Sequence, residues 1–245
     1  MILKQQSIAT ITILFLGFHF SSAQTFTMGK KCKEALNAGI AANLSGDYQT
    51  ALSTFESNQD NCKTKDGKEA FAVGKAEALN GLGRYEEAMA AADVALDATK
   101  GKSLNGHFQK GVAQNKLGQI EASQASLNQV MLLTEMNQNT AERASNYALM
   151  AAMYDRQLGN SDSAMHYMNK AMAMDPANSN FVIEKGDMYV RSQQYDAAFE
   201  QYDKAVEMGR SDVEMYEIRA NARLKMLESK YQTTKAKELK TKMTP

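Results

Sequence analysis

The stretch Gly83-Arg84-Tyr85-Glu86-Glu87-Ala88 decides the fold, because a glycine here stands between two long runs of helix-forming residues. The run Gly46-Asp47-Tyr48-Gln49-Thr50-Ala51 has the same pattern 37 residues earlier, and Gln194-Tyr195-Asp196-Ala197-Ala198 has it again near the end of the chain. Glycine ends a helix readily because it adopts a left-handed backbone conformation without steric cost. The stretch therefore indicates a helical hairpin that recurs along the chain.

The recurrence is regular over most of the sequence. Small residues return at intervals of 37, 35, 41, 34 and 34 residues, at Gly39, Ala76, Gly111, Ala152, Gly186 and Ala220. A turn position follows seven residues after each of the first five, at Gly46, Gly83, Gly118, Gly159 and Gln193. A bulky residue follows nine residues after the turn in four of the five units, at Phe55, Leu127, Met168 and Tyr202. Small residues let two helices approach, and one such hairpin has too little core to be stable without stacked neighbours.

The composition agrees with helices and limits the function. The chain has 15 glycines, two prolines and no tryptophan, and it is rich in strong helix formers. Without its first 23 residues it carries 27 basic and 28 acidic residues, so a general nucleic-acid binder is not expected. Glycines fall singly at turns rather than in phosphate-binding loops, and no serine or cysteine has a base partner at a catalytic spacing. We expect no enzyme, no catalytic residue and no cofactor.

The repeated runs quoted above resemble the tetratricopeptide repeat family, and so does the run Ala171-Met172-Ala173-Met174-Asp175-Pro176. The resemblance covers residues 32 to 230. The chain also resembles exported proteins of the Bacteroidota. The third and fourth units depart most from the family pattern. The resemblance implies an all-α, right-handed α-solenoid of about five helical hairpins plus a C-terminal capping helix. The helix pairs are expected at 30–44 with 48–60, 67–82 with 85–98, 103–117 with 120–135, 140–158 with 162–174, and 178–192 with 195–208.

The N-terminal stretch predicts export. Lys4 precedes an apolar run from Ile8 to Phe20, and small residues end at Ala23, a pattern typical of a secretory signal peptide. The run is shorter than a bilayer span requires, and Cys32 lies too far on for a lipid anchor, so we expect a periplasmic or secreted protein without a membrane span in the mature chain. The expected regions are a signal peptide at 1–23, a short segment at 24–31, the solenoid at 32–210 (units 32–65, 66–102, 103–138, 139–177 and 178–210), the capping helix at 211–230 and a basic tail at 231–245.

Two cysteines occur in the first hairpin: Cys32 opens its first helix and Cys62 follows its second. In an antiparallel hairpin these two ends lie side by side. Outside the cytoplasm such a pair is expected to be oxidised, so we predict a Cys32–Cys62 disulfide.

In the family that the chain resembles, the first helices line a concave groove that binds an extended peptide or a helix of a partner protein. The residues expected to face such a partner are apolar or asparagine: Leu36, Ile40, Val73, Asn80, Asn105, Phe108, Val112, Asn115, Asn146, Leu149, Met153, Asn180 and Ile183. An amide both donates and accepts hydrogen bonds, so asparagine suits a peptide backbone of any sequence. The alternative is that the apolar residues are half-buried between neighbouring first helices and the asparagines are simply solvated.

The expected function is therefore a non-enzymatic protein–protein interaction scaffold. The alternative is a small-ligand or copper-binding sensor of the periplasm with a pocket between the third and fourth units. Six methionines and His166 cluster there, and thioethers are soft ligands that suit Cu(I). Packing is the stronger explanation of most of these methionines, since Met168 occupies the bulky position of its unit and methionine fills irregular cores.

Overall fold

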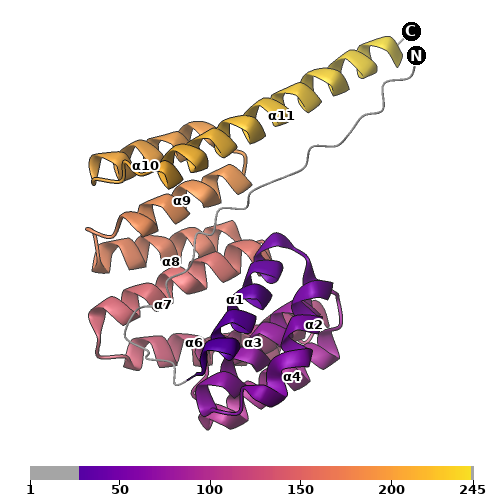
Figure 1. Ribbon diagram of the computed structural model, residues 1–245. Helices are drawn as coiled ribbons and strands as arrows, with labels where there is room; N and C mark the ends of the chain where they lie inside the picture. Colours follow the sequence, from indigo (N-terminus) through magenta and orange to yellow (C-terminus); the bar gives the residue numbers. More distant parts are fainter. Residues whose placement is uncertain (1–27, 244–245) are drawn as a thin grey trace.

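The computed structural model describes residues 28–243 and places eleven α-helices in that range, with no strand. The helices form antiparallel pairs that stack in chain order, as Figure 1 shows by the progression of colour. The solenoid predicted from the repeat is confirmed. The expected signal peptide lies outside the described residues. In the described part of the chain, no helix combines the length and the apolar character that a bilayer span requires.

The helix bounds agree closely with the repeat. The first three pairs are α1 (Lys30–Ser45) with α2 (Tyr48–Asn58), α3 (Lys65–Gly81) with α4 (Tyr85–Thr99), and α5 (Leu104–Lys116) with α6 (Ile120–Met136). A short 3₁₀ turn, Gln59–Asn61, follows α2. The later pairs are α7 (Thr140–Met153), continued by the π-helix η2 (Tyr154–Leu158), with α8 (Ser161–Met174), and α9 (Ser179–Arg191) with α10 (Tyr195–Glu207). The helix α11 (Val213–Met243) follows them.

Local chemistry fixes where the helices begin and end. Asp47, Thr64, Ser103 and Asn139 each accept a hydrogen bond from a backbone N–H of the first turn that follows, which satisfies donors that a helix start leaves free. At the hairpin turns the glycines adopt left-handed conformations, for example with φ of 75° at Gly83. The fifth unit has Gln193 in the same conformation, with φ of 61°.

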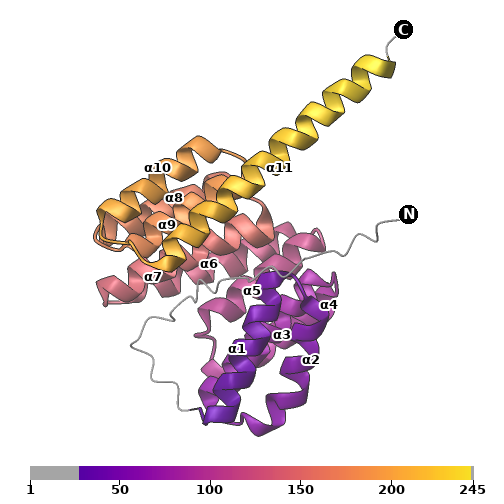
Figure 2. The same cartoon turned by 45° about the horizontal axis from the view of Figure 1, so that its top comes forward.

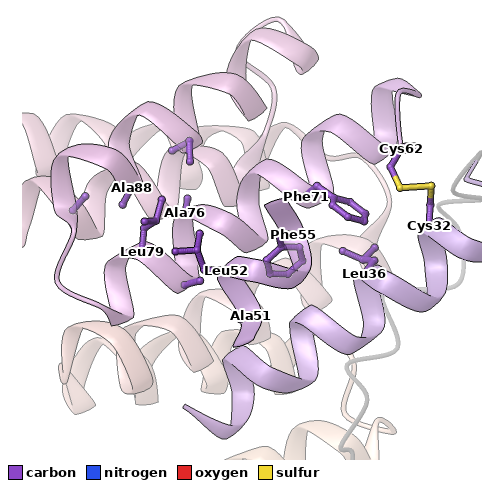
Figure 3. Packing of buried hydrophobic residues seen from close by; sticks show 14 of the residues in the cluster. Cys32, Leu36, Ala51, Leu52, Phe55, Cys62, Phe71, Ala76, Leu79 and Ala88 are labelled. Atoms are coloured by element: carbon purple, nitrogen blue, oxygen red, sulfur yellow. A yellow bond between two sulfur atoms is a disulfide. The ribbon is translucent and has the colours of Figure 1, made fainter. Parts of the chain in front are cut away.

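The small residues of the repeat make room for the bulky ones. A Cβ atom added to Gly39 or Gly74 would lie 2.4 or 2.3 Å from the Phe55 ring, so both helices lie in contact with its faces. Phe55 is also edge-on to Phe71, with ring centroids 5.7 Å apart. Figure 3 shows Phe55 at the centre of the first core cluster, with Leu36 and Phe71 beside it. In the last unit Tyr202 packs against Gly186 in the same way.

The prediction for the C-terminal end is partly wrong. We expected a capping helix at 211–230 followed by a separate basic tail at 231–245, but α11 continues to Met243 and extends well past α10 (Figures 1 and 2). No glycine or proline occurs between Gly209 and Pro245, and Lys, Ala, Glu, Leu and Met are strong helix formers. The residue types of this segment therefore favour continuation of the helix.

Candidate functional site on the inner surface

The first helices of the hairpins pack side by side in two groups, α1 with α3 and α5, and α7 with α9, and together they form what we call the inner surface. Contacts run from α1 to α3, from α3 to α5 and from α7 to α9. This is the surface on which the sequence places a partner groove. The question is which of the predicted side chains remain accessible on it.

Most of the predicted apolar stripe is core, and the accessible groove assigned to it is corrected accordingly. Phe108 and Ile183 are fully buried, and Leu36, Val112 and Met153 are buried as well. Phe108 packs edge-on against Tyr154, the first residue of η2, with ring centroids 5.8 Å apart. The π-helical turn therefore covers the middle of the stripe. Partly exposed predicted residues remain at Ile40, Val73, Asn80, Asn105, Asn146 and Leu149, and Asn115 and Asn180 are exposed.

Two asparagines tie neighbouring first helices together. Asn43 Nδ2 donates to the backbone oxygen of Gly74 at 3.0 Å, and 37 residues later Asn80 Nδ2 donates to that of Gln109 at 3.0 Å. Asn80 Nδ2 also lies 2.9 Å from Gln109 Oε1. The amide donors of Asn43 and Asn80 are therefore used within the protein, and only their oxygens remain for a ligand. Asn115, at the equivalent position of the third unit, is exposed.

A buried carboxylate joins units that are far apart in sequence. Glu77 on α3 accepts a hydrogen bond from Gln157 of η2, with Nε2 and Oε1 3.3 Å apart, and Asn43 Nδ2 lies 3.4 Å from its other oxygen. Burial raises the pKa of the Glu77 carboxyl, and the nearby Arg156 guanidinium and the Asn43 amide partly oppose that rise. The fourth unit therefore contacts the second unit across the inner surface. In this arrangement the surface is closed over Glu77.

The inner surface also holds unpaired acceptors. Four buried side-chain amide oxygens accept no hydrogen bond, and they come from four elements of the inner surface: Asn43 Oδ1, Asn80 Oδ1, Asn105 Oδ1 and Gln157 Oε1. A buried amide oxygen without a donor costs about 1–3 kcal/mol, so such groups in a native structure call for an explanation.

A charged network lies on the later first helices. The Glu184 carboxylate is 2.9 Å from guanidinium nitrogens of both Arg156 and Arg191, and Arg191 also pairs with Asp155. Asp187 accepts a hydrogen bond from the Tyr202 hydroxyl at 2.6 Å. Burial, and then the negative charge of Glu184, raise the pKa of Asp187 to about 6. These groups satisfy one another and fix α9 against η2.

Reasoning from the sequence alone did not select Glu77, Gln157 or the Asp155–Arg191 pair as site residues. A signal for two of the acids was present: Glu77 and Asp187 occupy the position that holds Ile40, Val112 and Met153 in the other units. An acid at an otherwise apolar position of a repeat indicates that its carboxylate has a specific hydrogen-bond or ion-pair partner within the fold. The π-helix that brings Gln157 to Glu77 has no comparable signal.

The methionine cluster is explained by packing. Met150 and Met168 are buried in the second core cluster, and Thr134 Oγ1 donates to Met150 Sδ at 3.8 Å. His166 is exposed, with its ring edge-on to Tyr167. One hollow of the described surface lies between the Gln59–Asn61 turn, α3 and α4, and another lies between the start of α10 and α11. No observation on the described residues favours the copper or small-ligand alternative.

The two cysteines lie at disulfide distance. The Cα atoms of Cys32 and Cys62 are 5.6 Å apart, and the sulfur atoms are bonded in Figure 3. Both side chains are buried against the first core cluster. The covalent link joins the start of α1 to the segment after α2, as the hairpin geometry predicts.

The comparisons with known proteins agree with the repeat. A tetratricopeptide repeat model matches residues 149–213. No curated protein matches the chain. Among solved structures, a thermophilic tetratricopeptide repeat protein of Thermus thermophilus is 20% identical over 79% of this chain and 99% of its own, with a TM-score of 0.46. MamA of Desulfovibrio magneticus RS-1, from residue 41 to its end, is 24% identical over 76% of this chain and 99% of its own, with a TM-score of 0.39.

A tetratricopeptide repeat protein of Parabacteroides merdae is 15% identical over 89% of this chain and 82% of its own, with a TM-score of 0.41. At these identities and TM-scores, none of the three likenesses supports an inference about what this chain binds. The tetratricopeptide repeat model matches residues 149–213, and antiparallel helical hairpins continue from there toward the N-terminus.

Proposed function

We propose that this protein is a non-enzymatic interaction scaffold that works outside the cytoplasm and binds an extended segment of a partner protein on its inner surface. The scaffold role follows the general use of tetratricopeptide repeats, and the export follows the signal-like pattern of residues 1–23. Binding of a segment on this surface rests on one observation, which is the set of four unpaired buried amide oxygens on α1, α3, α5 and η2.

An extended peptide suits these acceptors because its backbone offers N–H donors whatever its side chains are. Two partly exposed apolar side chains lie on the same surface: Val73 on α3, the helix that carries Asn80, and Leu149 on α7. They can supply apolar contacts to the partner. Burying an apolar side chain of the partner against them contributes about 1.5–3 kcal/mol. The partner therefore gains both donors for the protein's orphan acceptors and apolar burial.

Access to this site requires the Gln157–Glu77 contact to open. One hydrogen bond to a charged group contributes about 1.5–3 kcal/mol, which a peptide that buries a few apolar side chains exceeds. The partner N–H groups would then replace the Gln157 donor. The closed form is the free state of the scaffold in this proposal, and the bound form is more open.

A photo-crosslinking amino acid placed at Val73 tests the proposal in cells that export the protein. The matched control is the same amino acid at Val94, which is 53% exposed. Val94 lies on α4, the second helix of its hairpin, and so not on the inner surface. A discrete covalent adduct at position 73 that is absent at position 94 is the expected result, and mass spectrometry of the adduct identifies the bound segment. Adducts at position 94 alone would contradict binding on the inner surface.

A further inference from the structure

The outer face of α11 carries large apolar side chains that nothing in the described chain covers. Val213, Tyr216, Leu224, Leu227 and Tyr231 are 58–72% exposed. Their spacing, with Ala220 between them, is 3, 4, 4, 3 and 4 residues, which places all six within a sector of about 80° on an α-helix. We call these six residues the α11 stripe. Exposed apolar patches of this kind mark interaction surfaces.

The stripe faces away from the solenoid. Met215, Ile218 and Ala222 form the opposite side of α11 and are buried against α9 and α10 in the last core cluster. Beyond that contact, residues 230–236 are all exposed, and the helix projects from the stack (Figures 1 and 2). A helical segment of this length without tertiary contacts is marginal in water. A partner helix on the stripe would supply those contacts.

The charges beside the stripe identify the partner. Arg223 and Lys230 border it on one side, and Glu217 and Glu228 border it on the other. One Glu217 carboxylate oxygen is buried and has no hydrogen-bond partner. A uniformly charged ligand, such as an anionic lipid surface, would be repelled by one of the two borders. A surface with one basic and one acidic border is instead complementary to a second copy of itself.

We propose that two copies of this protein associate through parallel packing of their α11 helices along the stripe. Ala220, Leu224, Leu227 and Tyr231 follow heptad spacing, with Leu224 and Tyr231 at one seam position and Ala220 and Leu227 at the other. In this register Arg223 lies opposite the partner's Glu228, five residues further on, and the two-fold axis makes this contact twice. An antiparallel pair would instead place basic border against basic border and acidic against acidic.

The same register sets the length of the contact. Lys230 and Lys235 occupy the next pair of facing positions and repel, so the paired segment ends near Tyr231 and the lysine-rich ends diverge. The solenoids lie on opposite sides of the axis because each packs on the far side of its own α11. Both inner surfaces remain free for the partner proposed above, so this association is independent of that proposal.

Sedimentation velocity of the mature chain over a concentration series to about 100 µM tests the association. We expect a monomer–dimer equilibrium that Leu227→Asp weakens at least tenfold, with an unchanged helical signal and melting transition because Leu227 is exposed. The oxidised Leu227→Cys variant is expected to form a covalent dimer, because the two-fold axis places position 227 beside itself. Lys225→Cys is the matched control, because Lys225 is exposed and only two residues away but lies outside the α11 stripe. This variant should stay monomeric under denaturing conditions.

Three outcomes would overturn the proposal. A monomer at every concentration would exclude the association. A dimer that crosslinks through a mixture of Val213→Cys and Tyr231→Cys chains but not at position 227 would show antiparallel packing. A monomer that sediments with vesicles of phosphatidylglycerol and loses that binding with Leu227→Asp would assign the stripe to a lipid surface instead.

Discussion

Gln157 donates a hydrogen bond to Glu77, which lies 80 residues earlier in the chain, with 3.3 Å between Nε2 and Oε1. This contact joins the fourth helical hairpin to the second across the inner surface. Gln157 belongs to η2, a π-helix whose backbone hydrogen bonds span five residues instead of four, and the contact joins this turn to α3. The repeat predicts the helices but not this contact.

Gln157→Ala should loosen that closure. The substitution removes a donor to a buried carboxylate, a bond that contributes about 1.5–3 kcal/mol, so local opening of η2 and α3 should become at least tenfold more frequent. Native-state hydrogen exchange measures the change directly. Gln138→Ala, which removes an exposed amide from the α6–α7 loop, is the matched control. Unchanged exchange in α3 of the Gln157 variant would show that the contact does not hold the inner surface closed.

Asp187 makes stability depend on pH. Its pKa is about 6 in the folded protein because of burial and of Glu184, against about 3.9 in an unfolded chain. The native state therefore binds the proton more tightly, so this contribution to stability is fully present below about pH 3.9 and is lost as pH rises through about 6.

Urea denaturation at pH 7.5 and pH 5 measures the effect. In Asp187→Asn, which keeps an acceptor for Tyr202, the stability gained on lowering the pH should be smaller than in the wild type by about 1.4 kcal/mol. Equal gains in the two proteins would mean that the Asp187 pKa is not raised.

The Cys32–Cys62 bond should stabilise the first hairpin, which has a neighbour on one side only. Closing a loop of 30 residues lowers the entropy of the unfolded chain by an amount equivalent to about 3–4 kcal/mol. Replacing both cysteines by serine should therefore lower the unfolding free energy by about that amount, with faster hydrogen exchange in α1 and α2. A reducing agent should destabilise the wild type and leave the double variant unchanged. Two titratable thiols in the exported wild-type protein would contradict the pairing.

Gly74→Ala should destabilise the protein although alanine favours helices. In a free helix interior the change would add about 1 kcal/mol of stability. Here the new Cβ would lie 2.3 Å from the Phe55 ring, whose other face touches Gly39, so the ring has no room to move and overpacking should cost about 1–3 kcal/mol net. Gly29→Ala, with open space around the new Cβ, is the control for chemical denaturation. A gain in stability at position 74 would show that the contact relaxes without strain.

Local rules made most of the fold predictable from the sequence. The glycine turns and the pairing of Cys32 with Cys62 each depend on residues within one hairpin, and the structure places them as expected. The 41-residue interval between the third and fourth units is accommodated by α6, with 17 residues, and by α7 with η2.

The inner surface was less predictable because accessibility depends on how the hairpins stack. Phe108 occupies a repeat position that is expected to face the groove, yet Tyr154 of the π-helix packs against it and it is buried. Asn43 and Asn80 suit a peptide backbone by chemistry, yet the next first helix already uses their donors. Neither contact follows from a period of about 34 residues, since both depend on the curvature of the whole stack.

The central claim is that a partner segment binds on the inner surface once Glu77 and Gln157 separate. The variant Glu77→Ala removes the acceptor of the Gln157 hydrogen bond, and Gln138→Ala serves as its control. The measurement is the affinity of each variant for a synthetic peptide of the segment crosslinked at Val73. We expect Glu77→Ala to bind the peptide at least tenfold more tightly than the wild type, because no hydrogen bond to Glu77 has to break on binding, while Gln138→Ala binds like the wild type. Equal binding by Glu77→Ala and the wild type would contradict this claim.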